Sequence, residues 1–258
     1  MSKPSVFLDL DQWVRLESTD STNQYLSESS SPSGTIVTAR QQLKGKGRSG
    51  RAWRSSPGAA LYFSGILEWP EQPPGPFFSL ACGLAVLDAV RMHCPDSTGL
   101  LLKWPNDIIR RSVHAGQSNN GTSATNQEHI EKIGGVLIEG RAVSAGVWQT
   151  IVGIGLNWSE APAAEGGDAF APGALGCPGQ PEDLVPHLVR ALNHRAESFE
   201  ASHTLEEFRN ADLFSNRFVR CDDKSGRVVG LNSAGALVLD SGATIEDSAR
   251  SIELLQEP

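Results

Sequence analysis

Residues 44–54, which read KGKGRSGRAWR, form the densest cluster of positive charge in this chain. The segment carries five cations and no acid in a protein of formal charge −8, so its positive field is local. Glycines alternate with the cations, and a glycine lets backbone amides approach a ligand closely. Inward-facing amides and cations suit a phosphate or a carboxylate. A solvated basic loop or a nucleic-acid patch is an equally good interpretation of this segment alone.

A second candidate cluster is residues 100–107, LLLKWPND. A short apolar strand leads to Lys103 and then to Pro105, which ends the strand and fixes a turn. Asn106 and Asp107 then project from a defined corner, where they and Lys103 could serve a nucleotide and its metal. A turn stabilised by Asn and Asp side chains explains those two residues equally well. It does not so readily explain a lysine that ends an apolar strand.

Two further segments place polar groups where a ligand could bind. Residues 20–26 predict a helix start capped by Asp20 or Ser21, although a plain helix cap explains them without any ligand. Lys132 begins a strand in which two glycines allow close approach of the backbone. The G-x-G of residues 153–155 is a weak signal, because no phosphate-binding helix follows it.

The elements that must position these residues can be read from the sequence periodicity. Strands are predicted at 35–40 and 59–67 on either side of the basic loop, and again at 132–139 and 147–156. Apolar spacing predicts a buried helix over 77–94 and further helices from about Asp183 and over 204–211. Residues 112–128 predict a flexible polar loop, and 159–180 a long surface loop. Short β-rich runs after residue 213 predict a small all-β domain.

Composition limits the classes of protein. The chain has 258 residues, 39% hydrophobic and 20% charged, and its pI of about 5.3 argues against wholesale nucleic-acid or membrane binding. The N-terminus has no apolar stretch typical of a signal peptide. The four cysteines include no C-x-x-C pair, so we expect reduced thiols and a cytoplasmic protein.

Taken together and in order, the segments resemble the biotin–protein ligases, which biotinylate the carrier subunit of acetyl-CoA carboxylase. The resemblance spans residues 20–158, although Lys46 stands where an arginine is usual and the 112–128 insert lengthens a connection that is normally short. The segments that carry it are Ser21-Thr22-Asn23, Gln42 to Trp53, Lys103-Trp104-Pro105-Asn106-Asp107, Lys132 with Gly134-Gly135, and Gly153 to Asn157.

The resemblance implies an α+β fold. A catalytic domain like that of class II aminoacyl-tRNA synthetases, with a mixed sheet and helices, would occupy residues 1–212, and an SH3-like domain residues 213–258. The DNA-binding domain of the bifunctional ligases has no counterpart in this sequence, so no repressor activity is expected.

The resemblance also implies the chemistry. Biotin and ATP would form biotinyl-5′-AMP, with Mg²⁺ nearby, and a lysine of the biotin carboxyl carrier protein would then take the biotinyl group. Catalysis is expected from Lys132, Arg48 and Lys103. Biotin would be bound by Ser21, Thr22, Asn23, Gln42, Lys46, Gly47, Arg48, Lys132 and Gly135. ATP or the adenylate would be bound by Arg48, Arg51, Trp53, Lys103, Asn106, Asp107 and Asn157. Asp107 could contact either the metal or the ribose.

Two other functions compete with this one. A lipoate or octanoate ligase or transferase shares the fold, but the transferase needs a reactive thiol or lysine, and no cysteine here lies in an activating environment. A non-catalytic biotin or nucleotide sensor would not need Lys103, Asp107 and Lys132 together. An exposed sheet edge could also bind the carrier domain or a second copy of the chain.

Overall fold

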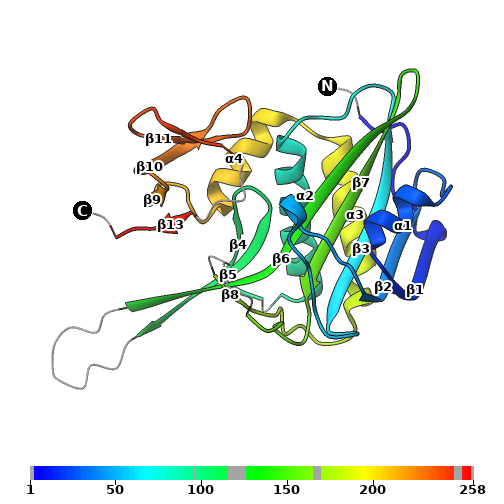
Figure 1. Ribbon diagram of the computed structural model, residues 1–258, viewed down its shortest axis with the longest axis horizontal. Helices are drawn as coiled ribbons and strands as arrows, with labels where there is room; N and C mark the ends of the chain where they lie inside the picture. Colours follow the sequence, from blue (N-terminus) through cyan, green and yellow to red (C-terminus); the bar gives the residue numbers. More distant parts are fainter. Residues whose placement is uncertain (1–2, 96, 116–125, 165–169, 247–251, 257–258) are drawn as a thin grey trace.

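A mixed eight-stranded sheet forms the centre of the protein (Figure 1). The computed structural model describes residues 3–95, 97–115, 126–164, 170–246 and 252–256. The strands run in the order β1-β2-β3-β7-β6-β5-β4, with β8 beside β6. Neighbours are antiparallel except β1–β2 and β6–β8. Their bounds are β1 (Trp13–Thr19), β2 (Ile36–Gln42), β3 (Ala60–Trp69), β4 (Leu100–Lys103), β5 (Asp107–Ala115), β6 (Asn126–Ser144), β7 (Val147–Asn157) and β8 (Ala171–Pro172).

Helices cover the two faces of this sheet unequally. On one face lies α2 (Phe77–His93), whose residues are buried almost all round, and it packs against α3 (Val185–Glu197) and α4 (Ala201–Ala211). The other face receives the short helix α1 (Thr22–Glu28). Ile66 packs in the small cluster under α1 whereas Leu67 packs in the main core, because successive strand residues point to opposite faces. The α1 face, on which Tyr62, Ser64 and Ile66 of β3 are buried, carries the candidate site.

A second sheet follows α4 and has five antiparallel strands in the order β12-β11-β10-β9-β13. Its strands are β9 (Phe218–Cys221), β10 (Lys224–Leu231), β11 (Leu237–Leu239), β12 (Thr244–Ile245) and β13 (Glu253–Leu254). The expected α+β class, with a mixed sheet, helices and a small β-rich C-terminal part, is confirmed. The division at residue 213 stays a prediction. Apolar side chains of both sheets belong to one continuous core.

The predicted loop at 112–128 is wrong at both ends. Residues 112–115 continue β5 and residues 126–128 begin β6, and they pair with each other in an antiparallel ribbon that projects from the molecule (Figure 1). Residues 116–125 lie outside the described part. The polar composition had suggested a loop, but a two-stranded ribbon in solvent needs no apolar core to pair its backbone groups. The Arg217 guanidinium donates to both carboxylate oxygens of Glu128, at 3.1 and 2.7 Å, and so ties the ribbon to the C-terminal part.

β5 was not predicted as a strand, and neither were β1 and β8. β1 precedes the region in which the first element was expected, and its half-buried, alternating pattern includes four polar residues, which weakens the apolar signal. β8 is only two residues long and lies in the predicted 159–180 loop. It forms because residues 171–172 pair with residues 131–132 of β6, which no local pattern reveals. Among the described residues, no helix is both long and apolar enough to cross a membrane.

A buried carboxyl group lies where α4 leads into the second sheet. Asp212 is 8% exposed and accepts hydrogen bonds from the Trp104 amide (3.3 Å) and the Ser215 hydroxyl (3.2 Å), and from the amides of Phe214 and Ser215. These partners are neutral. Burial raises the pKa of Asp212 to about 7, which the hydrogen bonds only partly oppose.

The stability of the protein should therefore depend on pH through Asp212. Between its unfolded pKa of about 3.9 and its folded pKa, the folded state retains a proton that the unfolded state releases, so rising pH favours unfolding. Asp212→Asn cannot titrate. Urea unfolding from about pH 5 to about pH 7 should show the wild type losing about 1.4 kcal/mol per pH unit relative to the variant. A pH-independent difference would contradict the raised pKa.

Candidate active site

The basic loop joins β2 to β3 and folds back on itself. The Gly47 amide donates to Arg51 O (2.7 Å) and the Trp53 amide to Gly45 O (2.8 Å), with the 3-10 turn η2 (Arg48–Gly50) at the tip. A Cβ on Gly45 would lie 2.5 Å from Trp53 O, so the narrow hairpin requires a glycine there. The backbone of the loop is thus bonded across the hairpin, and its role in binding an anion stays a prediction.

The lysines of this loop are tied to the start of α1. Lys44 Nζ lies 2.8 Å from Asp20 Oδ2, and Lys46 Nζ donates to Gln24 Oε1 at 3.4 Å. Arg48 is turned inward: burial lowers the pKa of its guanidinium, the negative charge of Asp107 opposes that shift, and the positive charge of Arg51 adds to it. The turn formed by residues 103–107 is called the KWPND corner below. The loop thus brings the positive charge of Arg48 close enough to interact with the negative charge of Asp107 at this corner.

A single carboxylate bridges two lysines at the centre of the site. Asp107 Oδ2 lies 2.9 Å from Lys103 Nζ, and Asp107 Oδ1 lies 2.8 Å from Lys132 Nζ. The three side chains are 14%, 13% and 25% exposed, respectively. Burial would raise the pKa of Asp107, but the charges and hydrogen bonds of Lys103 and Lys132 together outweigh it and hold that pKa below its usual value. Three sequence-predicted residues are therefore in direct contact.

The local fold explains this meeting. Lys103 and Asp107 are cross-strand partners at the tight β4–β5 turn, and Lys132 comes from β6, the next strand of the sheet. Asn106 fastens the turn to β6, because its Nδ2 donates to Val136 O (2.7 Å) and its own carbonyl accepts from the Val136 amide (2.9 Å). The Asn106 side chain is thus engaged with the protein backbone, as the turn interpretation of the sequence allowed.

The donor set at the bridge does not fit a resident Mg²⁺ ion. Magnesium prefers several oxygen ligands in an octahedral arrangement. Asp107 is the one carboxylate of the bridge, and both its oxygens face ammonium groups. The described residues contain no group of three or more His, Cys, Asp or Glu side chains placed to hold a metal.

A chain of buried polar side chains begins at α1. Ser21 is the N-cap, and the amide and hydroxyl of Thr22 both donate to Gln42 Oε1, at 2.7 and 3.1 Å. The Ser64 hydroxyl lies 2.7 Å from Thr22 Oγ1 and 2.6 Å from Asn23 Oδ1. The predicted Ser21, Thr22, Asn23 and Gln42 are thus brought together.

Glu139 of β6 determines which groups donate and which accept in this series of hydrogen bonds. Asn23 Nδ2 donates to Glu139 Oε2 at 2.7 Å, and a carboxylate can only accept, so Asn23 must present its Oδ1 to Ser64. Sequence reasoning missed both Ser64 and Glu139. A polar residue inside the apolar run of β3 was the available signal for Ser64, and an acid directly after an apolar strand was the signal for Glu139.

Two glycines of β7 leave space for the site residues. A Cβ on Gly153 would lie 2.2 Å from Asn23 Oδ1, and one on Gly155 would lie 2.7 Å from the indole of Trp53. The Trp53 ring therefore rests on bare backbone, and Lys132 Nζ lies 5.8 Å from its centroid. The close approach expected at these glycines is confirmed. The buried Trp53 Nε1 has no hydrogen-bond partner among the described residues.

Asn157 and Gly135 contact protein groups around the site. Asn157 accepts from the Ser55 hydroxyl (2.9 Å) and donates to Gly173 O (2.8 Å), so both ends of its amide bind protein groups. Gly135 lies against Asn106 and Asp107, where a Cβ would be 3.5 Å from Asn106 O. Direct ligand contact by these two residues stays a prediction, as do the ligand contacts assigned to every other site residue.

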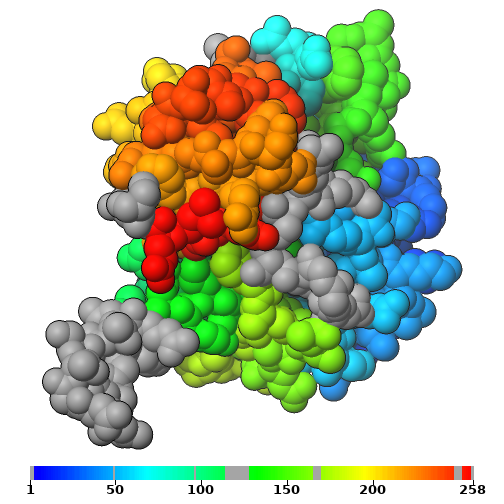
Figure 2. All heavy atoms as spheres, turned by 60° about the vertical axis from the view of Figure 1, so that its left-hand side comes forward, coloured from blue at the N-terminus to red at the C-terminus, as the bar shows by residue number. Residues whose placement is uncertain are grey.

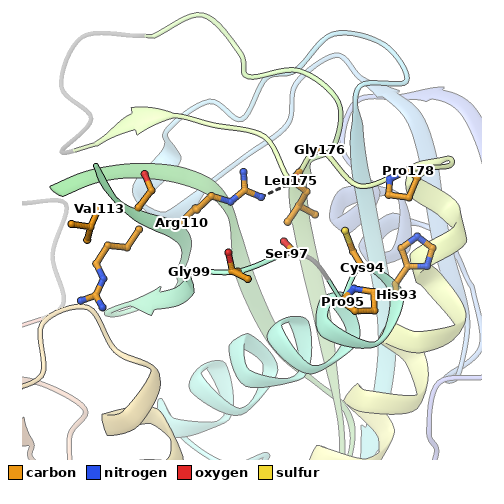
Figure 3. A pocket seen from close by; sticks show the side chains of 13 residues that line it. His93, Cys94, Pro95, Ser97, Gly99, Arg110, Val113, Leu175, Gly176 and Pro178 are labelled. Carbon is orange, nitrogen blue, oxygen red and sulfur yellow. Dashed lines mark hydrogen bonds between the residues drawn. The ribbon is translucent and has the colours of Figure 1, made fainter. Parts of the chain in front are cut away.

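A hollow of about 690 Å³ lies away from these side chains (Figure 3). The end of α2, β5 and residues 175–178 line it, and none of the predicted site residues does. Arg110 crosses it to donate to Ala174 O (2.9 Å) and Leu175 O (2.7 Å), as Figure 3 shows in part. These bonds fix the segment whose Gly173 amide donates to Lys132 O (2.9 Å), so Arg110 supports Lys132 from behind.

Residues 15–157 match the biotin/lipoate A/B protein ligase family, and this span is more than half of the chain. The chain belongs to that family. A biotin–[acetyl-CoA-carboxylase] ligase of Mycobacterium tuberculosis is 30% identical to it over 85% of this chain and 78% of that protein. A ligase of the same name from Paracoccus denitrificans is 34% identical over 62% of this chain and 58% of that protein.

Solved structures of the family share the fold. The biotin protein ligase of Aquifex aeolicus, determined with biotin and ATP, superposes with a TM-score of 0.71 over 95% of this chain and all of that chain, at 24% identity. The ligase of Leishmania major with biotinyl-5-AMP gives a TM-score of 0.56 at 22% identity, over 95% of this chain and 99% of that one. The fold of this family member is thus the ligase fold over nearly its whole length.

Removal of the bridging carboxylate should destabilise this family member strongly. In Asp107→Asn the two ammonium groups lose their shared counter-charge in a largely buried place, which should cost roughly 3 kcal/mol of unfolding free energy. Because the pKa of Asp107 is lowered, the loss should persist from neutral pH down to about pH 4 and shrink only in stronger acid.

The matched control is Lys44→Ala, which breaks the exposed ion pair with Asp20 and should cost less than about 1 kcal/mol. Urea unfolding of both variants measures the difference. Equal losses in the two variants would contradict the buried bridge.

Proposed function

We propose that this chain is an ATP-dependent biotin–protein ligase. It would join biotin to the α-phosphate of ATP, giving biotinyl-5′-AMP and pyrophosphate. It would then transfer the biotinyl group to a lysine of the biotin carboxyl carrier protein of acetyl-CoA carboxylase. The observation that carries the proposal is the Lys103–Asp107–Lys132 bridge, with Arg48 in its field and with the polar chain of α1 on the same sheet face.

The first step needs positive charge, because a carboxylate must approach a triphosphate. A biotin carboxylate oxygen attacks the α-phosphorus, and the bond to the departing pyrophosphate breaks. Two lysines share one carboxylate in the bridge, so the group retains net positive charge before any substrate binds. Lys132, the more exposed of the two, would hold the biotin carboxylate and the α-phosphate together, while Lys103 and Arg48 would stabilise the phosphate charge.

The two ends of biotin would meet different chemistry. The Thr22–Asn23–Ser64 chain offers hydroxyl and amide groups suited to the ureido ring, while the cations lie toward the carboxylate. Trp53 on Gly155 would flank the adenine side, beside Lys132. Mg²⁺ would enter bound to the phosphates of ATP, since the described residues offer no group of side chains placed to hold it.

In the second step the carrier amine attacks the carbonyl carbon of the mixed anhydride, and AMP leaves. No enzyme nucleophile is needed, because adenylation has already activated the acid. Asp107 is a poor general base, because its pKa is lowered and both its oxygens are bound to lysines. The chain thus acts by positioning and charge.

Other partners follow from the same proposal. Strand β1 is the outer strand of the central sheet, whereas β4, at the opposite edge, is covered by the bridge between Leu102 and Asp212. The β1 edge would bind the carrier domain or a second copy of the chain. We propose a cytoplasmic enzyme that binds neither DNA nor membranes, in keeping with its acidic composition.

The test is pyrophosphate exchange into ATP with different acids. Exchange should depend on biotin and should not occur with lipoate or octanoate. The reverse pattern would assign the chain to the lipoate branch of the family, and binding of biotin and ATP without any exchange would make it a sensor.

Lys132→Ala should lose the exchange reaction by roughly a hundredfold or more while remaining folded. Lys132→Arg keeps the charge and should retain part of it. Lys224→Ala removes a lysine on the second sheet, whose Nζ donates to Thr244 O, and should exchange normally. Full exchange by Lys132→Ala would refute the role given to Lys132.

A further inference from the structure

The KWPND corner is held from behind by the C-terminal part of the chain. The Leu213 amide donates to Leu102 O at 2.7 Å, and residues 102 and 212 form a parallel bridge. The Trp104 amide donates to Asp212 Oδ1 at 3.3 Å. Residues 212 and 213, which follow α4, therefore form hydrogen bonds with the residues on both sides of Lys103.

The indole of Trp104 reaches further, into the second sheet. It is 3% exposed, and its Nε1 donates to Gly235 O at 2.9 Å, in the turn between β10 and β11. Figure 2 shows this part of the chain, in orange to red, packed directly against the main body, where Gly235 also meets Pro76. A buried indole N–H needs an acceptor, so this bond fixes the turn and the corner relative to each other.

Lys103 is the residue that this arrangement confines. It lies between two anchored neighbours, its Nζ is 5.9 Å from the centroid of the Phe214 ring, and its side chain is 13% exposed.

The polar chain on α1 has no such support. Its hydrogen bonds join α1, β2, β3 and β6, and none of those that the structure shows comes from beyond β6. Among the described residues, hydrogen bonds from the C-terminal part therefore reach the turn that carries Lys103, and none reaches the polar chain on α1.

We propose that Trp104 and Asp212 are positioning residues through which the second sheet sets the position of the Lys103 ammonium. The second sheet thereby affects the binding and reaction of ATP at the KWPND corner, but not the binding of biotin at the polar chain on α1. This inference rests on the proposed ligase function. It assigns a role to the tryptophan of the KWPND motif, for which no ligand contact was predicted. The second sheet acts on the reaction through this contact.

The decisive variant is Trp104→Phe, which keeps an aromatic ring but removes the indole donor together with some buried volume, a loss of volume that the control below matches. Its KM for ATP should rise, or its kcat for adenylate formation should fall, by roughly tenfold or more, because misplaced charge is costly at a reacting phosphate. The Kd for biotin, measured by calorimetry without ATP, should stay within about twofold of the wild type.

The matched control is Trp69→Phe. Trp69 is also fully buried, but its Nε1 has no hydrogen-bond partner among the described residues, so the change removes an indole donor without breaking a bond. This variant should keep the wild-type KM for ATP. Loss of ATP handling by both tryptophan variants, or of biotin affinity in Trp104→Phe, would mean a general packing role and would overturn the proposal.

Variants of Asp212 test the same contact at a different residue, and hydrogen exchange tests it without any enzymatic reaction. Asp212→Ala removes the acceptor of the Trp104 amide and should reproduce the ATP defect, while Asp212→Asn, which keeps one carbonyl oxygen there, should restore part of it. Hydrogen exchange should quicken in residues 100–107 of Trp104→Phe and not in residues 60–69. If Trp104→Phe changed neither the ATP kinetics nor the rate of hydrogen exchange in residues 100–107, the proposal would be refuted.

Failure of the ligase function itself would look different. The wild type would then show no biotin-dependent exchange of pyrophosphate, whereas hydrogen exchange at the corner would still report whether Trp104 couples the second sheet to Lys103.

Discussion

The shared carboxylate of Asp107 is the constraint on which the site depends. Two lysines would repel each other in a largely buried place, and one aspartate between them supplies a counter-charge that both share. Every neighbouring feature serves that geometry. The β4–β5 turn makes Lys103 and Asp107 cross-strand partners, Asn106 fastens the turn to β6, and Arg110 fixes the segment behind Lys132. The result is concentrated positive charge in a protein that is acidic overall.

The two faces of the central sheet have different roles. One face carries α2, α3 and α4 and most of the apolar core, while the other carries α1, the polar chain and the basic loop. Small residues make the second face usable, because Gly153 and Gly155 leave space for Asn23 and for the Trp53 ring. Stability thus comes mainly from one side of the sheet and chemistry from the other. The C-terminal part joins the two through Trp104, which is buried in the core yet adjoins Lys103.

Much of this could be predicted from the sequence, and the exceptions have physical reasons. Long apolar strands, the helix at 77–94 and the small β-rich region have strong periodicity, and the cations lie in motifs specific enough to indicate the family. Strand β8 was missed because its partner on β6 is distant in sequence, and the outer part of the ribbon was missed because its polar composition is typical of a loop. Lys103, Asp107 and Lys132 were identified as separate residues, but their common bridge depends on strand register. Ser64 and Glu139 were missed because each is a single polar residue beside an apolar run.

The bridge can be measured directly with a double-mutant cycle of Lys103→Met, Lys132→Met and the double variant, followed by urea unfolding. Either lysine alone can neutralise Asp107, but loss of both leaves a buried carboxylate without a counter-charge from the bridge. The double variant should therefore lose about 1 kcal/mol or more beyond the sum of the single losses. Additivity within about 0.5 kcal/mol would show that the lysines do not share the carboxylate, and would contradict this account of the site.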